Sequence, residues 1–88
     1  MIRRRIVVHG LVQGVFFRDT VRRQASTRGM AGWVRNNPDG TVEAVFEGSE
    51  DGVDALVRLC REGPPGARVD RVDVFDEAPE ELSGFAIR

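Results

Sequence analysis

Reactive side chains and metal ligands are scarce in this sequence. Its 88 residues include one cysteine and one histidine. A single cysteine cannot form an intramolecular disulfide bond, and this cysteine usage indicates a reducing, cytoplasmic compartment. One cysteine and one histidine also cannot supply the ligand spacing of a zinc site. We therefore expect a cytoplasmic protein whose function does not depend on a Cys/His metal centre.

Long apolar runs and an excess of charge are absent as well. Three arginines near the N-terminus, residues 3–5, are followed by only three apolar residues, 6–8. That stretch is too short for a signal-peptide core or a transmembrane span. The net charge is −1, although all 13 basic residues are arginines. Such a balance predicts neither a nucleic-acid nor a membrane partner.

The length and the order of apolar patterns predict one domain, residues 1–88, with a modest hydrophobic core. Strands are expected at residues 2–9, 30–36, 41–47, 69–75 and 85–88, and helices at residues 17–28 and between Ser49 and Gly63. The order β-α-β-β-α-β, with a short extra strand, is typical of a ferredoxin-like split βαβ sandwich in the α+β class. We expect an antiparallel sheet with both helices on one face.

The loop between the first strand and the first helix has the features of an anion site. It contains Gly14 and delivers Arg18 to the first turn of the helix. Backbone N–H groups of a tight turn can converge on one anion beside the positive end of a helix dipole. The guanidinium of Arg18 adds a planar fork of donors suited to two phosphate oxygens. The loop is therefore predicted to bind phosphate.

Asn36 is expected to lie near this loop. The first helix carries the chain away by roughly 15 Å, at 1.5 Å per residue. The strand ending at Asn36 returns by about 20 Å, at 3.3 Å per residue. An amide with donors and an acceptor is thus brought beside the phosphate loop, although a purely structural role at the strand end remains an alternative.

Two stretches of the chain resemble known signatures. Residues 10–18 read GLVQGVFFR, and residues 32–36 read GWVRN, followed by Gly40, Val42 and Gly48. They are similar to the first and second signatures of the acylphosphatase family, and the resemblance covers essentially the whole chain. It implies hydrolysis of the carboxyl-phosphate anhydride of small acyl phosphates to a carboxylate and inorganic phosphate, without a cofactor.

The resemblance also implies roles for individual residues. Arg18 would bind the phosphate and Asn36 would hold the attacking water. The loop amides that would share in phosphate binding are those of Gln13, Gly14, Val15, Phe16 and Phe17. The partner would be a small-molecule acyl phosphate, and we expect the protein to be a monomer.

The chemistry is consistent with so few reactive groups. The leaving carboxylate has a pKa of about 4 to 5 and needs little acid assistance. What remains is charge stabilisation and alignment of water in line with the leaving group. Asn36 is a neutral amide and cannot act as a general base. Two acceptors for the water's proton remain possible. One is a phosphate oxygen of the substrate, and the other is a carboxylate reached through a relay of water molecules.

Other interpretations of the chain remain open. Ferredoxin-like sandwiches also serve as non-catalytic modules that bind RNA or small ligands. An RNA module should carry aromatic residues on its central strands within a basic consensus, and residues 6–8 and 42–46 lack one. A third possibility is similarity to the acylphosphatase-like module of larger carbamoyl-transfer proteins.

Several remaining polar residues are expected to be structural. His9 should be a strand residue with a satisfied ring, and Cys60 a small core residue on the second helix. Asp19 should favour the dipole of the first helix. Arg3, Arg4 and Arg5 are expected on a solvated strand face.

Overall fold

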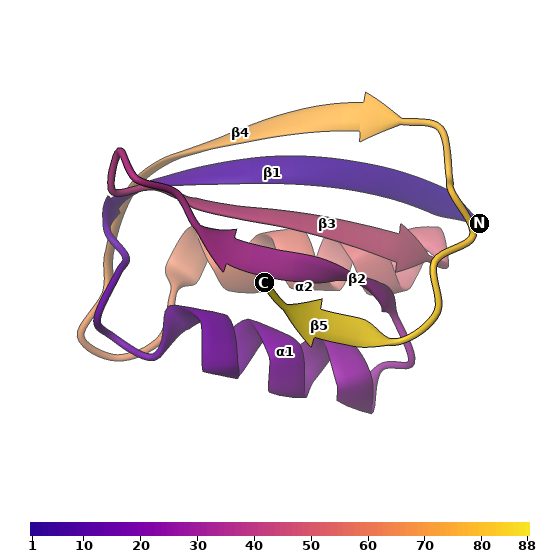
Figure 1. Ribbon diagram of the computed structural model, residues 1–88, viewed down its shortest axis with the longest axis horizontal. Coiled ribbons are helices and arrows are strands. Elements are labelled where there is room, and N and C mark those ends of the chain that lie inside the picture. Colours follow the sequence, from indigo (N-terminus) through magenta and orange to yellow (C-terminus); the bar gives the residue numbers. More distant parts are fainter.

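Five strands form one sheet in the computed structural model, which describes residues 1–88. The elements are β1 (Ile2–Leu11), α1 (Phe17–Thr27), β2 (Ala31–Asn36), β3 (Val42–Gly48), α2 (Glu50–Glu62), β4 (Arg68–Glu77) and β5 (Phe85–Ile87). The strands lie in the order β4-β1-β3-β2-β5 (Figure 1). The predicted element order and the ferredoxin-like α+β fold are confirmed.

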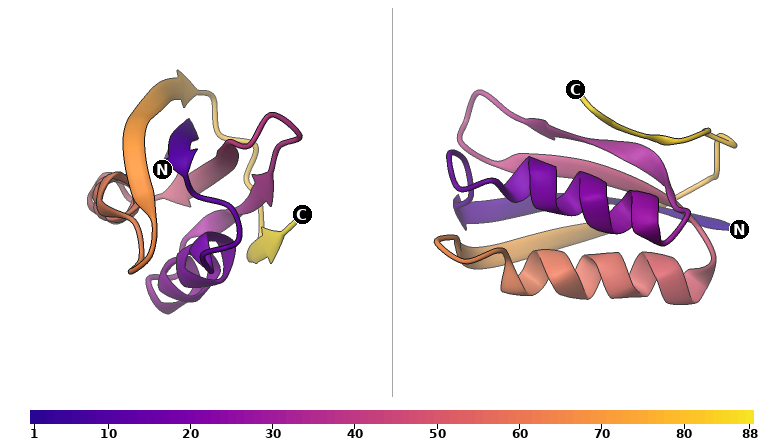
Figure 2. Two further views of the ribbon diagram at one scale, coloured as in Figure 1. Left: turned by 90° about the vertical axis from the view of Figure 1, so that its left-hand side faces the viewer. Right: turned by 90° about the horizontal axis from the view of Figure 1, so that it is seen from below.

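Both helices cover the same face of the sheet (Figure 2). Phe17, Val21 and Ala25 are the buried residues of α1, at the spacing that places them on one helical face. The buried residues of α2 are Val53, Leu56, Val57 and Cys60. Together with inward residues of β1, β2 and β3, and with Val12 just after β1, they form one cluster of 14 buried residues. Neither helix is long and apolar enough to cross a membrane.

The predicted antiparallel sheet needs one correction. Four strands pair antiparallel, but β5 pairs in parallel with β2, from Gly32 opposite Phe85 to Val34 opposite Ile87. The sheet is therefore mixed. The physical reason is that the chain crosses from β4, on one edge of the sheet, to the opposite edge before it enters β5. This crossing brings the C-terminal strand beside β2, close to where β2 ends.

The pairing of β1 with β4 is irregular just before the loop that follows β1. The register shifts between His9 and Gly10 of β1, so that Asp70 of β4 has no paired residue opposite. A Cβ atom at Gly10 would overlap the carbonyl oxygen of Arg68. Glycine is therefore needed at the point where β1 passes into the loop.

Arg3 is buried, which contradicts the expected solvated face. Its side chain is 7% exposed and lies 2.9 Å from the fully buried carboxylate of Glu47. Glu47 also accepts hydrogen bonds from the backbone N–H groups of Glu80 at 2.8 Å and Leu82 at 2.9 Å. A buried charge is tolerated when it is paired and its hydrogen bonds are satisfied. This pair therefore holds the connection that leads into β5.

Candidate active site

The loop after β1, the start of α1 and the end of β2 lie at the same end of the molecule (Figure 1). A cavity of about 320 Å³ lies between them. It is lined by Val12, Gly14, Phe16, Phe17, Arg18, Asp19, Asn36 and Ile87. Five of the residues singled out from the sequence are among them. Two residues distant in the chain, Arg18 and Asn36, thus line one cavity.

The loop beside this cavity has unused backbone donors. Gly14 has φ 75° and Phe16 has φ 62°, so the chain turns twice through the left-handed region. The backbone N–H groups of residues 13–17 donate no hydrogen bond within the protein. Orphan donors in such a turn, at a helix N-terminus, suit an anion.

Gln13 and Val15 have different surroundings from the other loop residues. Neither lines the cavity. The side chain of Gln13 donates hydrogen bonds to the carbonyl oxygens of Asn37 and Thr41, at 2.8 and 3.0 Å. Val15 packs against the hydrophobic core. Their side chains therefore anchor the loop at both sides, and only their backbone amides remain available to a ligand.

Arg18 is a cation without a carboxylate partner. Its guanidinium forms no ion pair and no hydrogen bond within the protein, whereas eight other arginines pair with Asp or Glu. Its side chain is half-buried at the start of α1, beside the free loop amides. A fork of guanidinium donors that is not engaged elsewhere can bind two oxygens of one phosphate.

Asn36 carries the second unsatisfied group. Its Oδ1 atom is buried and is the one buried side-chain oxygen or nitrogen without a hydrogen-bond partner. Buried polar atoms are nearly always hydrogen-bonded, so such an exception calls for an explanation. An acceptor at the wall of a cavity can receive a hydrogen bond from a water molecule or from a ligand.

The cavity is also lined by three residues that were not assigned to it from the sequence. Val12 continues the buried side of β1, and Ile87 arrives through the parallel pairing of β5. Asp19 lies within hydrogen-bond reach of Arg22 at 3.3 Å and Arg23 at 3.0 Å. Alternation along β1 is a signal for Val12, but no local signal identifies Ile87, because its position depends on long-range pairing.

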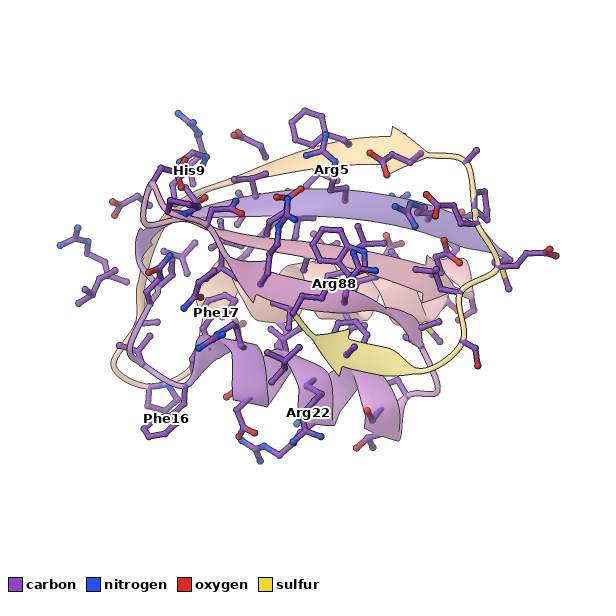
Figure 3. The ribbon with its side chains drawn as sticks, viewed as in Figure 1. Arg5, His9, Phe16, Phe17, Arg22 and Arg88 are labelled. Atoms are coloured by element: carbon purple, nitrogen blue, oxygen red, sulfur yellow. The ribbon has the colours of Figure 1, made fainter.

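His9 and Cys60 lie outside the site, as expected. Nε2 of His9 is 3.0 Å from Oδ2 of Asp73, and Figure 3 shows His9 well apart from Phe16 and Phe17. Complete burial in the core raises the pKa of the Cys60 thiol to about 12. A thiol in that environment is protonated at neutral pH and unreactive.

Comparison with known proteins identifies the family. The profile of the Acylphosphatase family matches residues 4–87. An acylphosphatase of Rubrobacter xylanophilus is 58% identical over 85 residues, which cover 96% of this chain and 77% of the relative. The crystal structure of acylphosphatase from Bacillus subtilis matches with a TM-score of 0.96 at 38% identity, covering 100% of this chain and 99% of that one.

A segment of a much larger protein is also similar. The crystal structure of full-length HypF in the phosphate- and nucleotide-bound form matches with a TM-score of 0.91 at 32% identity, covering 99% of this chain and 12% of that chain. The relative and the Bacillus structure are instead matched over most of their own length. The chain belongs to the acylphosphatase family of hydrolases.

Proposed function

We propose that the cavity hydrolyses the carboxyl-phosphate anhydride bond of small acyl phosphates, giving a carboxylate and inorganic phosphate. The observation that carries this proposal is the pairing of two unsatisfied groups in one cavity. One is the free guanidinium of Arg18, and the other is the buried, unpartnered Oδ1 of Asn36. A phosphate suits such a donor, and a water molecule suits such an acceptor.

The phosphate is bound by the loop and by Arg18. The amides of Gln13, Gly14, Val15, Phe16 and Phe17 have no acceptor within the protein. In the proposed complex they donate to the phosphate oxygens, together with the guanidinium of Arg18. These fixed donors stabilise the charge on the transferring phosphoryl group without reorganisation during the reaction.

Asn36 positions the attacking water. Its Oδ1 accepts a hydrogen bond from the water and directs the water's lone pair toward the phosphorus. The P–O bond to the carboxylate breaks as the new P–O bond forms, and the electron pair leaves with the carboxylate. The role of Asn36 is alignment, which can contribute several kcal/mol when the reacting atoms are held in line.

The water's proton passes to a phosphate oxygen of the substrate in this proposal. The competing relay needs a carboxylate at the cavity, and Asp19 is the only one among the lining residues. Its two oxygens accept hydrogen bonds from Arg22 and Arg23. Both oxygens of Asp19 are therefore already engaged with donors of the protein. The departing carboxylate needs no protonation because of its low pKa.

We propose that the protein is a monomer and that its partner is a small acyl phosphate. The RNA-binding alternative requires aromatic side chains that are free to stack on bases. Trp33, on the face of the sheet away from the helices, is 8% exposed and is covered by the guanidinium groups of Arg35 and Arg88. That coverage counts against base stacking and supports the enzymatic interpretation.

The proposal is tested by following the absorbance of benzoyl phosphate at neutral pH without added metal. Arg18→Ala and Asn36→Ala should each lose on the order of a hundredfold in kcat/KM, as expected for removal of one transition-state donor or alignment group. Arg58→Ala, which removes an exposed and unpaired arginine of α2, is the matched control and should retain full activity. Absence of wild-type activity above buffer would contradict the proposal.

A further inference from the structure

Phe16 occupies a backbone conformation that its side chain disfavours. Its φ and ψ are 62° and 24°, in the left-handed region. Bulky residues are genuine outliers there, since the Cβ atom crowds the backbone. Strained residues of this kind cluster at functional sites, where the surrounding structure holds them in place. The strain at Phe16 therefore calls for a functional reason.

The same residue stands at a position where other residue types would stabilise the helix. Phe16 is the N-cap of α1 and provides no side-chain hydrogen bond. The N-cap of α2 is Ser49, whose side chain accepts from the N–H of Gly52 at 3.1 Å. Ser, Thr, Asp, Asn and Gly are favoured at N-caps over large apolar residues. Neither backbone conformation nor capping accounts for a phenyl ring at this position.

Packing does not account for the ring either. Phe16 is 80% exposed, the highest fraction among the large apolar residues of the chain. Its ring projects from the loop at the start of α1, away from the core (Figure 3). Phe17, the next residue, is 2% exposed and supplies the core contact. The ring of Phe16 is thus held in solvent at the edge of the cavity that Phe16 lines.

A second exposed apolar residue lines the same cavity. Ile87, from β5, is 40% exposed. If the proposed function is correct, Arg18, Asn36 and the loop amides are engaged with phosphate and water. The remaining charged residue of the lining, Asp19, is held by Arg22 and Arg23. What is left for the acyl part of the substrate is apolar, and a carboxylate stands nearby that would repel an anionic acyl group.

We propose that Phe16 and Ile87 form an acyl subsite that selects acyl phosphates with an uncharged, apolar and preferably aromatic acyl group. This inference rests on the proposed hydrolysis and adds a substrate class to it. An exposed side chain changes rotamer on the picosecond to nanosecond timescale. The ring of Phe16 can therefore turn onto an aromatic acyl group whose phosphate is bound in the loop, and cover it from water.

The test compares two substrates that share the phosphate and differ in the acyl group. In the wild type and in Phe16→Asn, kcat/KM is measured for benzoyl phosphate and for acetyl phosphate. The benzoyl-to-acetyl ratio should fall about threefold to tenfold in Phe16→Asn, the range of one aromatic contact. A disturbance of the loop would lower kcat/KM for both substrates alike, because both share the phosphate and its backbone donors, so the ratio reports on the acyl group alone. Comparing ratios between variants removes the intrinsic difference in reactivity of the two substrates.

Two further variants complete the design. Ile87→Thr keeps a β-branched side chain in β5 and should lower the same ratio in the same direction. Phe75→Asn is the matched control, since Phe75 is also an exposed phenylalanine, 42% exposed, but lies on β4 outside the cavity. Its ratio should equal that of the wild type.

The outcomes separate this inference from the proposed function. If Phe16→Asn lowers kcat/KM equally for both substrates, the ring supports the loop and no acyl subsite exists. The subsite is equally excluded if the ratio does not change while Arg18→Ala and Asn36→Ala still lose on the order of a hundredfold in kcat/KM. The proposed hydrolysis then stands without the subsite. If the wild type hydrolyses neither substrate, the proposed function is wrong and the subsite falls with it.

Discussion

Gln13 and Thr41 connect the loop between β1 and α1 to the hairpin turn that follows Asn36. Nε2 of Gln13 donates a hydrogen bond to the carbonyl oxygen of Thr41 at 3.0 Å and a second one to that of Asn37 at 2.8 Å. The turn is itself held together, because the N–H of Asn37 donates to the carbonyl oxygen of Thr41 at 2.8 Å. One side-chain amide thus fixes the loop relative to the strand end that carries Asn36.

Replacing Gln13 by leucine should reduce turnover more than it reduces phosphate binding. Leucine cannot donate to either carbonyl, so the distance between the loop and Asn36 is no longer fixed. A displacement of about 1 Å between reacting groups can cost up to a hundredfold, and we expect a loss of about tenfold in kcat. The measurement is kcat with benzoyl phosphate beside the inhibition constant of inorganic phosphate, which should change by less than about threefold.

The control for this substitution is Gln24→Leu, since Gln24 lies on α1 outside the cavity and contacts Arg28. It should leave kcat unchanged. The Gln13→Leu substitution should also have little further effect in an Asn36→Ala background, because Gln13 acts through the position of Asn36. If the two losses simply multiply, the coupling through Asn36 is refuted.

Replacing Phe16 by asparagine should make the protein more stable. Asparagine tolerates the left-handed conformation better than a bulky residue, and little packing is lost because the ring is 80% exposed. We expect the free energy of unfolding to rise by about 0.5 to 1 kcal/mol. Urea denaturation provides the measurement.

Phe75→Asn serves as the comparison and should change stability in the opposite direction. Phe75 is on a strand, where asparagine is disfavoured, and the guanidinium carbon of Arg5 lies 4.4 Å from the centre of its ring. A Phe16→Asn variant that is less stable than wild type would show that the ring supports the loop in the free protein.

Much of the site follows from local patterns in the sequence. The alternation of β1 and the helical spacing of Phe17, Val21 and Ala25 locate the loop between them. The rise per residue of a helix and of a strand is enough to bring Asn36 back to that loop. These inferences succeed because they depend on periodicity and length.

The features that the sequence did not reveal depend on long-range contacts. The parallel pairing of the three-residue strand β5 with β2 has no signature in the local sequence. This pairing places Ile87 at the cavity. The burial of Arg3 requires Glu47, 44 residues away in the chain. The left-handed conformation of Phe16 runs against its intrinsic preference, so propensity predicts the opposite. Tertiary structure overrides local preference at each of these positions.

Replacing Asp19 by asparagine tests how the water's proton is removed. In the proposed mechanism a phosphate oxygen of the substrate takes the proton, so kcat should stay within about threefold of wild type. The measurement is the pH profile of kcat with benzoyl phosphate, which should keep its shape. A loss of on the order of a hundredfold or more would instead support a relay through Asp19.

The Arg22→Ala variant is a useful control for this experiment. It removes one of the two guanidinium groups that hold Asp19 and leaves the carboxylate in place. If Asp19 were the proton acceptor, freeing its carboxylate would change kcat. We expect no such change.

The buried pair of Arg3 and Glu47 should make stability depend on pH. Burial disfavours the ionised carboxylate, but hydrogen bonds from the Glu80 amide, the Arg3 guanidinium and the Leu82 amide outweigh it and hold the pKa of Glu47 below its usual 4.5. A lowered pKa in the folded state means that the unfolded chain binds more protons in acid. The stabilisation is therefore present above pH 4.5 and is lost as the pH falls through the folded-state pKa. The free energy of unfolding should decrease below about pH 4.5.

Glu47→Gln should remove both the stabilisation and part of its pH dependence. Each oxygen of Glu47 accepts from a backbone N–H, so a glutamine must turn its own NH₂ group toward a donor. Arg3 loses its buried counter-charge but keeps its ion pair with Glu77 at 2.9 Å. The expected loss therefore lies at the low end of the range for breaking a buried pair, about 3 kcal/mol. We expect that loss at pH 7 in urea denaturation, with a shallower decrease in stability below pH 4.5.

The matched control for this last experiment is Glu80→Gln. The carboxylate of Glu80 lies 3.3 Å from Arg3, but its side chain is 64% exposed. Exposed ion pairs contribute about 0 to 1 kcal/mol, so this variant should be nearly as stable as wild type.

Because Glu47 also holds the connection into β5, the Glu47→Gln variant should have a higher KM for benzoyl phosphate through displacement of Ile87. A Glu47→Gln protein with wild-type stability at pH 7 and the wild-type slope in acid would show that Arg3 and Glu47 do not stabilise the fold as a pair.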